Sequence, residues 1–210
     1  MPVASKVSRA GPSPRPRAPG SATAAGTDRP ATPAREPRVL LYDDGRHAGP
    51  LYQFAPPLTP DDFVATVDQL ADSGVDTLVY AAGLEGGTQL YDSQVAQTWG
   101  DNVKQWTHPV WYRAGRHLRQ LIDDGHDPLR LICDRAHEQG LLLLAANWVS
   151  LQGADRAREA GRGRQSDFVF DHARFEVGPE TDPRATVTSP RRFSFLHKEV
   201  REERFRVFEE

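Results

Sequence analysis

Two stretches of the chain share one pattern, an amphipathic helix that ends at a glycine and is followed at once by a short apolar run. The first stretch, residues 67–83, reads VDQLADSGVDTLVYAAG, and the second, residues 133–148, reads CDRAHEQGLLLLAANW. A glycine just past a helix supplies the left-handed C-cap, and the β-branched or leucine-rich run after it is typical of a parallel strand buried on both faces. The repeated pattern therefore predicts consecutive parallel βα units, and hence an α/β fold.

The limits of the expected elements follow from the same kind of signal. Thr59 and Asp127 each offer a capping side chain directly before a proline, which predicts that helices begin there. Helical spacing of apolar residues then continues as far as Gly74 and Gly140. We expect parallel strands at residues 38–42, 75–81 and 141–146. We expect further helices at residues 113–123 and from His197 onward, and an exposed, partly helical loop at residues 150–165.

Residues 1–37 differ in composition from the rest of the chain. They hold eight of the 17 prolines, and six basic residues face two acidic ones, a net charge of +4 in a chain whose total is −3. This segment has almost no large apolar side chains, and their burial could not offset the entropy lost on ordering. We therefore expect a disordered leader. The scattered single arginines favour a solvated tail over a nucleic-acid or anionic-surface partner.

Other features exclude several classes of protein. No apolar stretch approaches the ~20 residues that cross a bilayer, and no secretory-signal pattern follows the first basic residues, so we expect no membrane association and a cytoplasmic location by default. Cys133 is the single cysteine, which excludes an internal disulfide and a multi-cysteine zinc site. It lies on the apolar stripe of a predicted helix, so we expect a small buried side chain rather than a nucleophile.

Ligands of parallel α/β folds bind at the carboxyl ends of the strands, so the loops that follow the strands are the place to look for chemistry. The loop after the second strand, residues 83–125, is far longer than is usual between such elements. Polar and aromatic residues follow all three strands, and from these loops we select as candidate substrate-binding residues Asp43, Asp44, Tyr91, Asp92, Trp99, Asn147 and Trp148.

Two of these residues are candidates for catalysis. Glycoside hydrolysis needs two carboxyl groups on either side of the bond. Because consecutive strand residues point to opposite sides, at most one of Asp43 and Asp44 can face such a site. Asp44 and Asp92 are the candidates, although each is also a plausible turn or cap acceptor. His47 with either of the first two acids, and His108, offer metal donors, but without a metal-binding spacing, so we expect no metal and no cofactor.

All four tryptophans fall in or beside the loops after the second and third strands: Trp99, Trp106, Trp111 and Trp148. An indole face stacks well on the face of a sugar, which favours a carbohydrate ligand. A packed lid over the sheet explains the same placement equally well, because indole rings also fill cores.

Residues 38–210 resemble the glycoside-hydrolase-like (β/α)8 barrel proteins of bacteria. The resemblance is carried by LYDDG at residues 41–45, LTPDD at 58–62, YDS at 91–93 with WG at 99–100, GHDPL at 125–129 and FLHKEVR at 195–201. It implies a TIM-type barrel and a reaction on carbohydrate. It also implies that a fourth strand, ending in an acidic residue at the barrel mouth, would come after residue 210.

The sequence thus predicts an incomplete (β/α)8 TIM-type barrel of about three parallel strands, preceded by a disordered leader. Three parallel strands alone leave an open edge and an uncovered face, which a closed barrel removes. On this interpretation the chain is the amino-terminal part of a glycoside-hydrolase-like protein that binds or acts on carbohydrate and is not catalytically complete alone. The alternative is a small complete α/β domain, a non-enzymatic carbohydrate-binding or interaction module.

Overall fold

The computed structural model describes residues 36–44, 49–177 and 191–210. The chain divides into two units, Met1–Ala34 and Arg35–Glu210. The expected leader lies almost entirely outside the described residues, so its disorder stays a prediction. The fold described below is that of the second unit.

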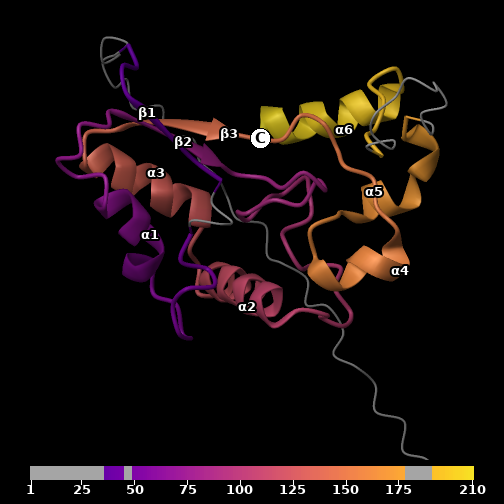
Figure 1. Ribbon diagram of the computed structural model, residues 1–210, viewed down its shortest axis with the longest axis horizontal. Helices are drawn as coiled ribbons and strands as arrows, with labels where there is room; N and C mark the ends of the chain where they lie inside the picture. Colours follow the sequence, from indigo (N-terminus) through magenta and orange to yellow (C-terminus); the bar gives the residue numbers. More distant parts are fainter. Residues whose placement is uncertain (1–35, 45–48, 178–190) are drawn as a thin grey trace, which may run out of the picture. The chain divides into compact units, whose positions relative to one another are not determined.

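Three strands form one parallel sheet whose order follows the chain. They are β1 (Leu40–Asp43), β2 (Thr77–Ala81) and β3 (Leu142–Ala146), with β2 in the middle. The α/β class and the three parallel strands are therefore confirmed. The first strand runs one residue further than predicted, because Asp43 still pairs with Tyr80. In Figure 1 the helices α1 and α3 lie along one side of this sheet.

Helix α1 (Pro60–Asp68) begins where the sequence predicted and ends earlier. The Thr59 hydroxyl accepts the amide N–H of Asp62 at 3.1 Å, and the Asp62 carboxylate accepts the amide N–H of Thr59 at 3.2 Å, which together make a capping box. The helix does not continue to Gly74. Asp72 adopts a left-handed conformation (φ 58°), as does Gly74 (φ 82°), so the chain turns toward β2 through a series of tight turns.

Helices α2 (Pro109–Asp123) and α3 (Pro128–Glu138) also begin at side-chain caps. His108 accepts the amide N–H of Val110 through Nδ1 at 3.3 Å, so α2 begins earlier than the predicted Arg113. The Asp127 carboxylate accepts the amide N–H groups of Leu129 and Arg130 at 2.8 and 3.3 Å, as the predicted helix start required.

The main core lies between the sheet and the helices on its one covered face. Residues paired across parallel strands point to the same side, so Leu41, Leu78 and Leu143 face the helices. The core contains residues from β2 and from all three of these helices, among them Phe63, Val67, Leu78, Tyr80, Leu118, Leu121, Ile132 and Ala136.

The opposite face of the sheet is largely open. Leu40 is 53% exposed and Leu144 is 40% exposed, whereas on the central strand Thr77 is buried and Val79 is partly buried. The expectation that each strand is buried on both faces is therefore wrong for β1 and β3. The reason is that the described residues leave much of this second face uncovered.

The prediction for Cys133 is also wrong, because its side chain is only partly buried. The residues of α3 that face the core are Pro128, Ile132 and Ala136. Cys133 lies at the margin of that stripe, and its sulfur is 3.9 Å from Nδ1 of His137 on the exposed side of the helix.

Residues 150–165 are helical in part, as predicted, but they are not simply an exposed loop. Leu151 and Gly161 are buried, and a Cβ on Gly161 would lie 2.4 Å from Cγ2 of Thr107. A buried glycine gives no apolar signal in the sequence, so the charged residues around Gly161 led to the prediction of an exposed loop. This part of the chain contains α4 (Arg156–Glu159), η1 (Ala160–Arg162), α5 (Asp167–Asp171), η2 (Ala173–Phe175) and α6 (Lys198–Glu209).

A second, smaller core joins these later elements: Leu151, Val169, Phe175, Phe193 and Val200. On α6, the predicted apolar face is confirmed for Val200, Arg204 and Val207, which are buried, whereas Phe208 is half exposed. Among the helices of the described part, none has the length and apolar character that a membrane span requires.

Candidate functional site

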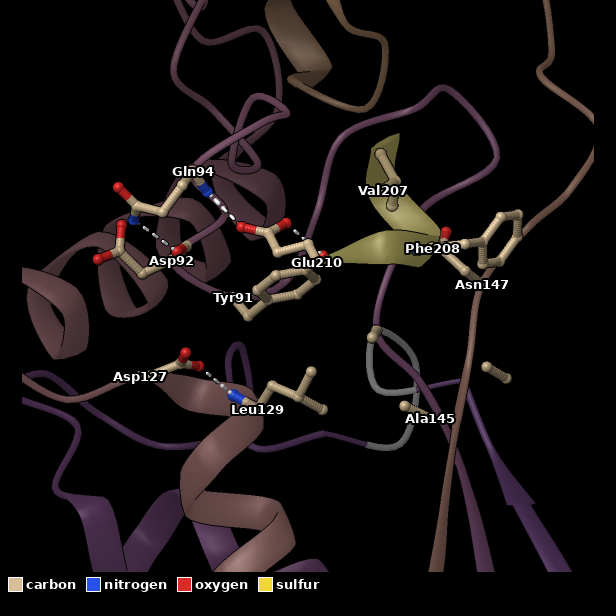
Figure 2. A pocket seen from close by; sticks show the side chains of 12 residues that line it. Tyr91, Asp92, Gln94, Asp127, Leu129, Ala145, Asn147, Val207, Phe208 and Glu210 are labelled. Carbon is tan, nitrogen blue, oxygen red and sulfur yellow. Dashed lines mark hydrogen bonds between the residues drawn. The ribbon is translucent and has the colours of Figure 1, made fainter. Parts of the chain in front are cut away.

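A pocket of about 540 Å³ lies at the carboxyl ends of β2 and β3. We call it the strand-end pocket. It is lined by Ala82, Tyr91, Asp92, Gln94, Asp127, Leu129, Ala145, Ala146, Asn147, Val207, Phe208 and Glu210. Figure 2 shows these side chains converging from the strand ends, from the start of α3 and from the end of α6. Of the seven predicted binding residues, the structure brings Tyr91, Asp92 and Asn147 together here.

The carboxylate of Glu210 ties the end of α6 to the long loop after β2. It accepts the hydroxyl of Tyr91 at 3.0 Å, the hydroxyl of Ser93 at 2.7 Å and the amide N–H of Gln94. Burial raises the pKa of Tyr91 well above its ordinary value, and the Glu210 acceptor raises it further. The phenol therefore remains a donor across the physiological range, and Figure 2 shows its ring forming one wall of the pocket.

The amide of Asn147 is held in one orientation by two buried partners. Its Nδ2 donates to Oε1 of Gln89 at 2.9 Å, and its Oδ1 accepts from the guanidinium of Arg204 at 3.0 Å. Gln89 is in turn fixed, because its Nε2 donates to the carbonyl of Gly87 at 3.1 Å. Asn147 thus keeps one N–H and one lone pair for a ligand.

This arrangement needs a glycine at position 83. A Cβ there would lie 2.3 Å from Oδ1 of Asn147 and 2.5 Å from Oε1 of Gln89, distances that real side chains do not tolerate. The loop that follows β2 therefore leaves room for two amide side chains, Gln89 of the same loop and Asn147 after β3.

The remaining acids of the pocket differ in what else they contact. Asp127 lines the pocket and at the same time caps α3. Asp92 also lines the pocket, and its backbone carbonyl accepts from the side chain of Gln94 at 3.0 Å. The pocket therefore has an acidic lining from three segments of the chain.

Asp43 and Asp44 lie at the end of β1 and are not among the residues that line the strand-end pocket. Asp43 is buried and shares a face with its partner Tyr80, the face that the helices cover. Burial raises the pKa of Tyr80, and the negative charges of the two aspartates raise it further. Of the two catalytic candidates, Asp92 therefore lines the strand-end pocket and Asp44 does not.

The tryptophans divide between core and surface. Trp99 is buried, donates its indole N–H to the carbonyl of Arg162 at 2.9 Å and packs against Trp111 at 5.8 Å between ring centroids. Trp148 is 42% exposed and lines a separate cavity of about 210 Å³, together with Tyr42 and Asn147. Trp99 is therefore part of the main core, and the exposed indole of Trp148 lies beside the strand-end pocket rather than inside it.

A metal site receives no support from the described geometry. His47 lies outside the described residues, and His108 is the cap of α2. Within the three described ranges, no group of three His, Cys, Asp or Glu side chains could hold an ion.

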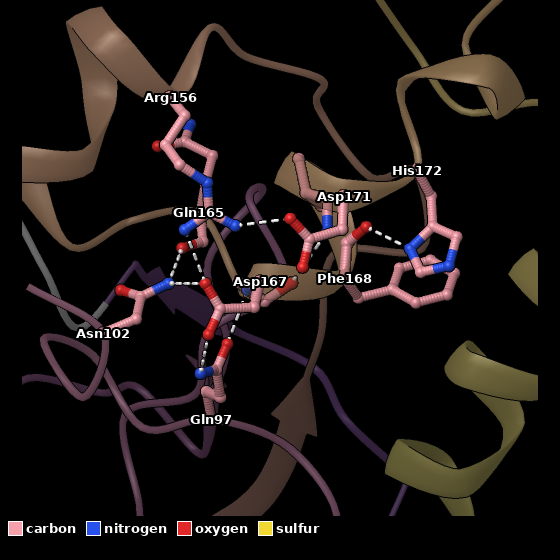
Figure 3. A network of polar contacts seen from close by, with 10 residues as sticks. Gln97, Asn102, Arg156, Gln165, Asp167, Phe168, Asp171 and His172 are labelled. Atoms are coloured by element: carbon pink, nitrogen blue, oxygen red, sulfur yellow. Dashed lines mark hydrogen bonds and ion pairs between the residues drawn. The ribbon is translucent and has the colours of Figure 1, made fainter.

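A polar network fastens the long loop after β2 to α4 and α5 (Figure 3). The carboxylate of Asp167 accepts from Gln97 at 2.9 Å, from Asn102 at 3.2 Å and from Arg156 at 2.8 Å. Arg156 also pairs with Asp171 at 2.7 Å. Burial alone would raise the pKa of Asp167, but these hydrogen bonds, with that of Arg156 the largest, outweigh it and lower the pKa.

Three residues of this site, Gln89, Arg204 and Glu210, were not predicted as such. Arg204 did carry a signal, since an arginine on the apolar face of a predicted helix is unusual. Gln89 and Glu210 carried none, because their role depends on contacts with segments more than 50 residues away. No protein-family model and no curated protein sequence matches this chain, so function is inferred from the pocket itself.

Proposed function

We propose that residues 38–210 are the amino-terminal part of a glycoside-hydrolase-like (β/α)8 barrel and that the strand-end pocket binds carbohydrate. One observation carries the proposal: Tyr91, Asp92 and Asn147 surround a single pocket at the carboxyl ends of two adjacent parallel strands. Barrel enzymes bind their ligands at this end of the strands.

The barrel assignment is supported by the way the chain winds. The strand order follows the sequence, and α1 and α3 pack against each other on one face of the sheet. A barrel places each strand beside the one before it and its helices on the outer face. The open face presents Leu40, Val79 and Leu144, which share one side by register, and branched aliphatic side chains of this kind fill barrel interiors.

The lining of the pocket suits a sugar. Carbohydrate hydroxyls both donate and accept, and the pocket offers carboxylate acceptors, the remaining N–H of Asn147 and its remaining lone pair. Phe208 adds a half-exposed ring that can lie against the apolar face of a pyranose.

Binding without hydrolysis is the activity that this lining supports best. A glycosidase needs two carboxyl groups available to the bond, one as acid and one as base or nucleophile. Here Glu210 accepts three hydrogen bonds from the loop, and Asp127 is engaged at the start of α3. The same observation favours a second candidate function, a non-enzymatic carbohydrate-binding module.

The proposal is tested by titrating a saccharide panel into the folded chain by calorimetry or NMR. We expect saturable binding that Asn147→Ala abolishes, while Gln53→Ala, an exposed amide in the loop before α1, leaves binding unchanged. Absence of binding by every saccharide at millimolar concentration would refute the proposal.

A parallel assay on aryl glycosides separates binding from catalysis. We expect no turnover by these residues alone. Clear turnover that Asp44→Asn removes would instead assign a working catalytic role to the end of β1.

A further inference from the structure

Arg204 is a buried arginine with few partners. Its residue is 2% exposed, and its guanidinium donates one hydrogen bond, from one terminal nitrogen to Oδ1 of Asn147 at 3.0 Å. Its Nε and its other terminal nitrogen are buried without a hydrogen-bond partner in the described part of the chain. Buried donors of a charged group are normally satisfied, so two of the three guanidinium nitrogens lack an expected acceptor among the described residues.

The guanidinium lies directly against the wall of the strand-end pocket. Asn147, its hydrogen-bond partner, lines that pocket, and so does Phe208, whose ring centroid is 5.6 Å from the guanidinium carbon. Phe208 is half exposed, whereas the guanidinium beside it is buried, so a ligand must displace this ring to reach Arg204. Burial lowers the pKa of Arg204, but an arginine remains charged at any physiological pH.

We propose that Arg204 receives a carboxylate of the ligand and that the pocket therefore selects acidic saccharides containing a uronic acid. This inference rests on the proposed carbohydrate binding. The terminal nitrogen that donates to Asn147 has a second N–H, and each of the two unpaired nitrogens lies next to this nitrogen in the guanidinium. The guanidinium can thus present a two-pronged donor, the geometry that matches a planar carboxylate.

The acidic lining narrows the choice of anion. Asp92, Asp127 and Glu210 also line the pocket and repel any anion, so a bound anion must offer hydrogen-bond donors to these carboxylates as well. A uronic acid meets both requirements, because its single carboxylate reaches the guanidinium while its hydroxyl groups donate to the carboxylates of the lining.

Matched pairs of methyl glycosides test this selectivity in the full chain. Each pair differs only at C6, where the uronide has a carboxylate and the neutral sugar a hydroxymethyl group, in the gluco, galacto and manno series. We expect at least one uronide to bind about tenfold or more tightly than its neutral partner, the size of a charged hydrogen bond. Equal affinity within every pair overturns the inference alone, and no binding of any sugar overturns the proposed function with it.

Two variants show whether Arg204 is the cause. We expect Arg204→Met to remove the uronide preference and Arg204→Lys to retain part of it. Arg206→Met, an exposed position that pairs with Glu203, is the control and should leave the preference unchanged. If Arg204→Met fails to fold, the lysine variant still decides, since a preference equal to that of Arg206→Met would overturn the assignment.

Thermal unfolding separates a ligand-binding arginine from a structural one. Replacing a buried charge that lacks partners by an apolar side chain of similar size is often neutral or stabilising. We therefore expect Arg204→Met to keep or raise the unfolding midpoint while selectivity falls. A lower midpoint together with unchanged selectivity would show that the residue only stabilises the fold.

Discussion

At the scale of single residues, Gly83 decides whether the two amides of the site can meet. We predict that Gly83→Ala lowers the free energy of unfolding by about 1 to 3 kcal/mol, because its Cβ would overlap Asn147 and Gln89. Urea unfolding measures this loss, and saccharide titration should show weaker binding. Gly125→Ala is the comparison: its Cβ meets open space, so only the cost of its left-handed backbone, about 1 kcal/mol, is expected. Equal stability of Gly83→Ala and the wild type would contradict the packing argument.

Part of the site was predictable residue by residue, because parallel strands end at one edge. Tyr91, Asp92 and Asn147 follow strands that the sequence already indicated, and they line one pocket. Trp99 shows the limit of such reasoning, since a loop position does not reveal that the indole is buried against Trp111. Arg204 reaches Asn147 only through the docking of α6, which no local pattern specifies.

At the scale of elements, α1 depends on its capping box. We predict that Thr59→Ala destabilises the protein by about 0.5 to 2 kcal/mol, since the amide of Asp62 loses its acceptor at the helix start. Chemical denaturation checks the value. Thr59→Ser keeps the hydroxyl and should restore most of the stability, and a loss as large as that of alanine would exclude the cap as the cause.

The clamp formed by Asp167 between the long loop and α5 should depend on pH. The folded state lowers the pKa of this carboxyl, so its contribution is present above the unfolded value, roughly 3.9, and is lost as the pH falls through the lower folded value. We predict that Asp167→Asn is less stable than the wild type at pH 7 and that the difference shrinks below about pH 4.

Unfolding midpoints between pH 7 and pH 3 provide this measurement. Asp123→Asn, an exposed residue of α2, controls for the loss of one negative charge. A difference between Asp167→Asn and the wild type that stays constant over the whole range would contradict the role of the carboxylate.

The starts of α1 and α3 were predicted well because a capping side chain followed by a proline is a local signal. The proline that follows Thr59 and the one that follows Asp127 fix the backbone where the hydrogen bonds begin. The end of α1 was predicted less well, since the left-handed turn at Asp72 has no marker as strong as a glycine. The burial of Gly161 was not predicted, because its close packing against Thr107 leaves no periodic signal in the sequence.

At the scale of the whole folded unit, the open face of the sheet should promote self-association. Leu40, Tyr42 and Leu144 lie on this face and are exposed, and β1 and β3 are the edges of the sheet. Exposed apolar edge strands pair readily with other chains. We predict that scattering by the wild type grows with concentration and that Leu144→Lys reduces it.

Leu196→Lys is the matched comparison, because this leucine is highly exposed but lies outside the sheet. It should leave the scattering unchanged. Equal suppression by both variants would point to a general effect of charge, and not to the face of the sheet.

The strand-end pocket joins parts of the chain that are far apart: Asn147 and Arg204 are separated by 57 positions, and Tyr91 and Glu210 by 119. The sheet and its covering helices need only the earlier part. During translation, therefore, the scaffold can form well before the recognition surface exists. A nascent chain whose α6 is still inside the ribosome is expected to have folded its sheet and to be unable to bind the proposed saccharide.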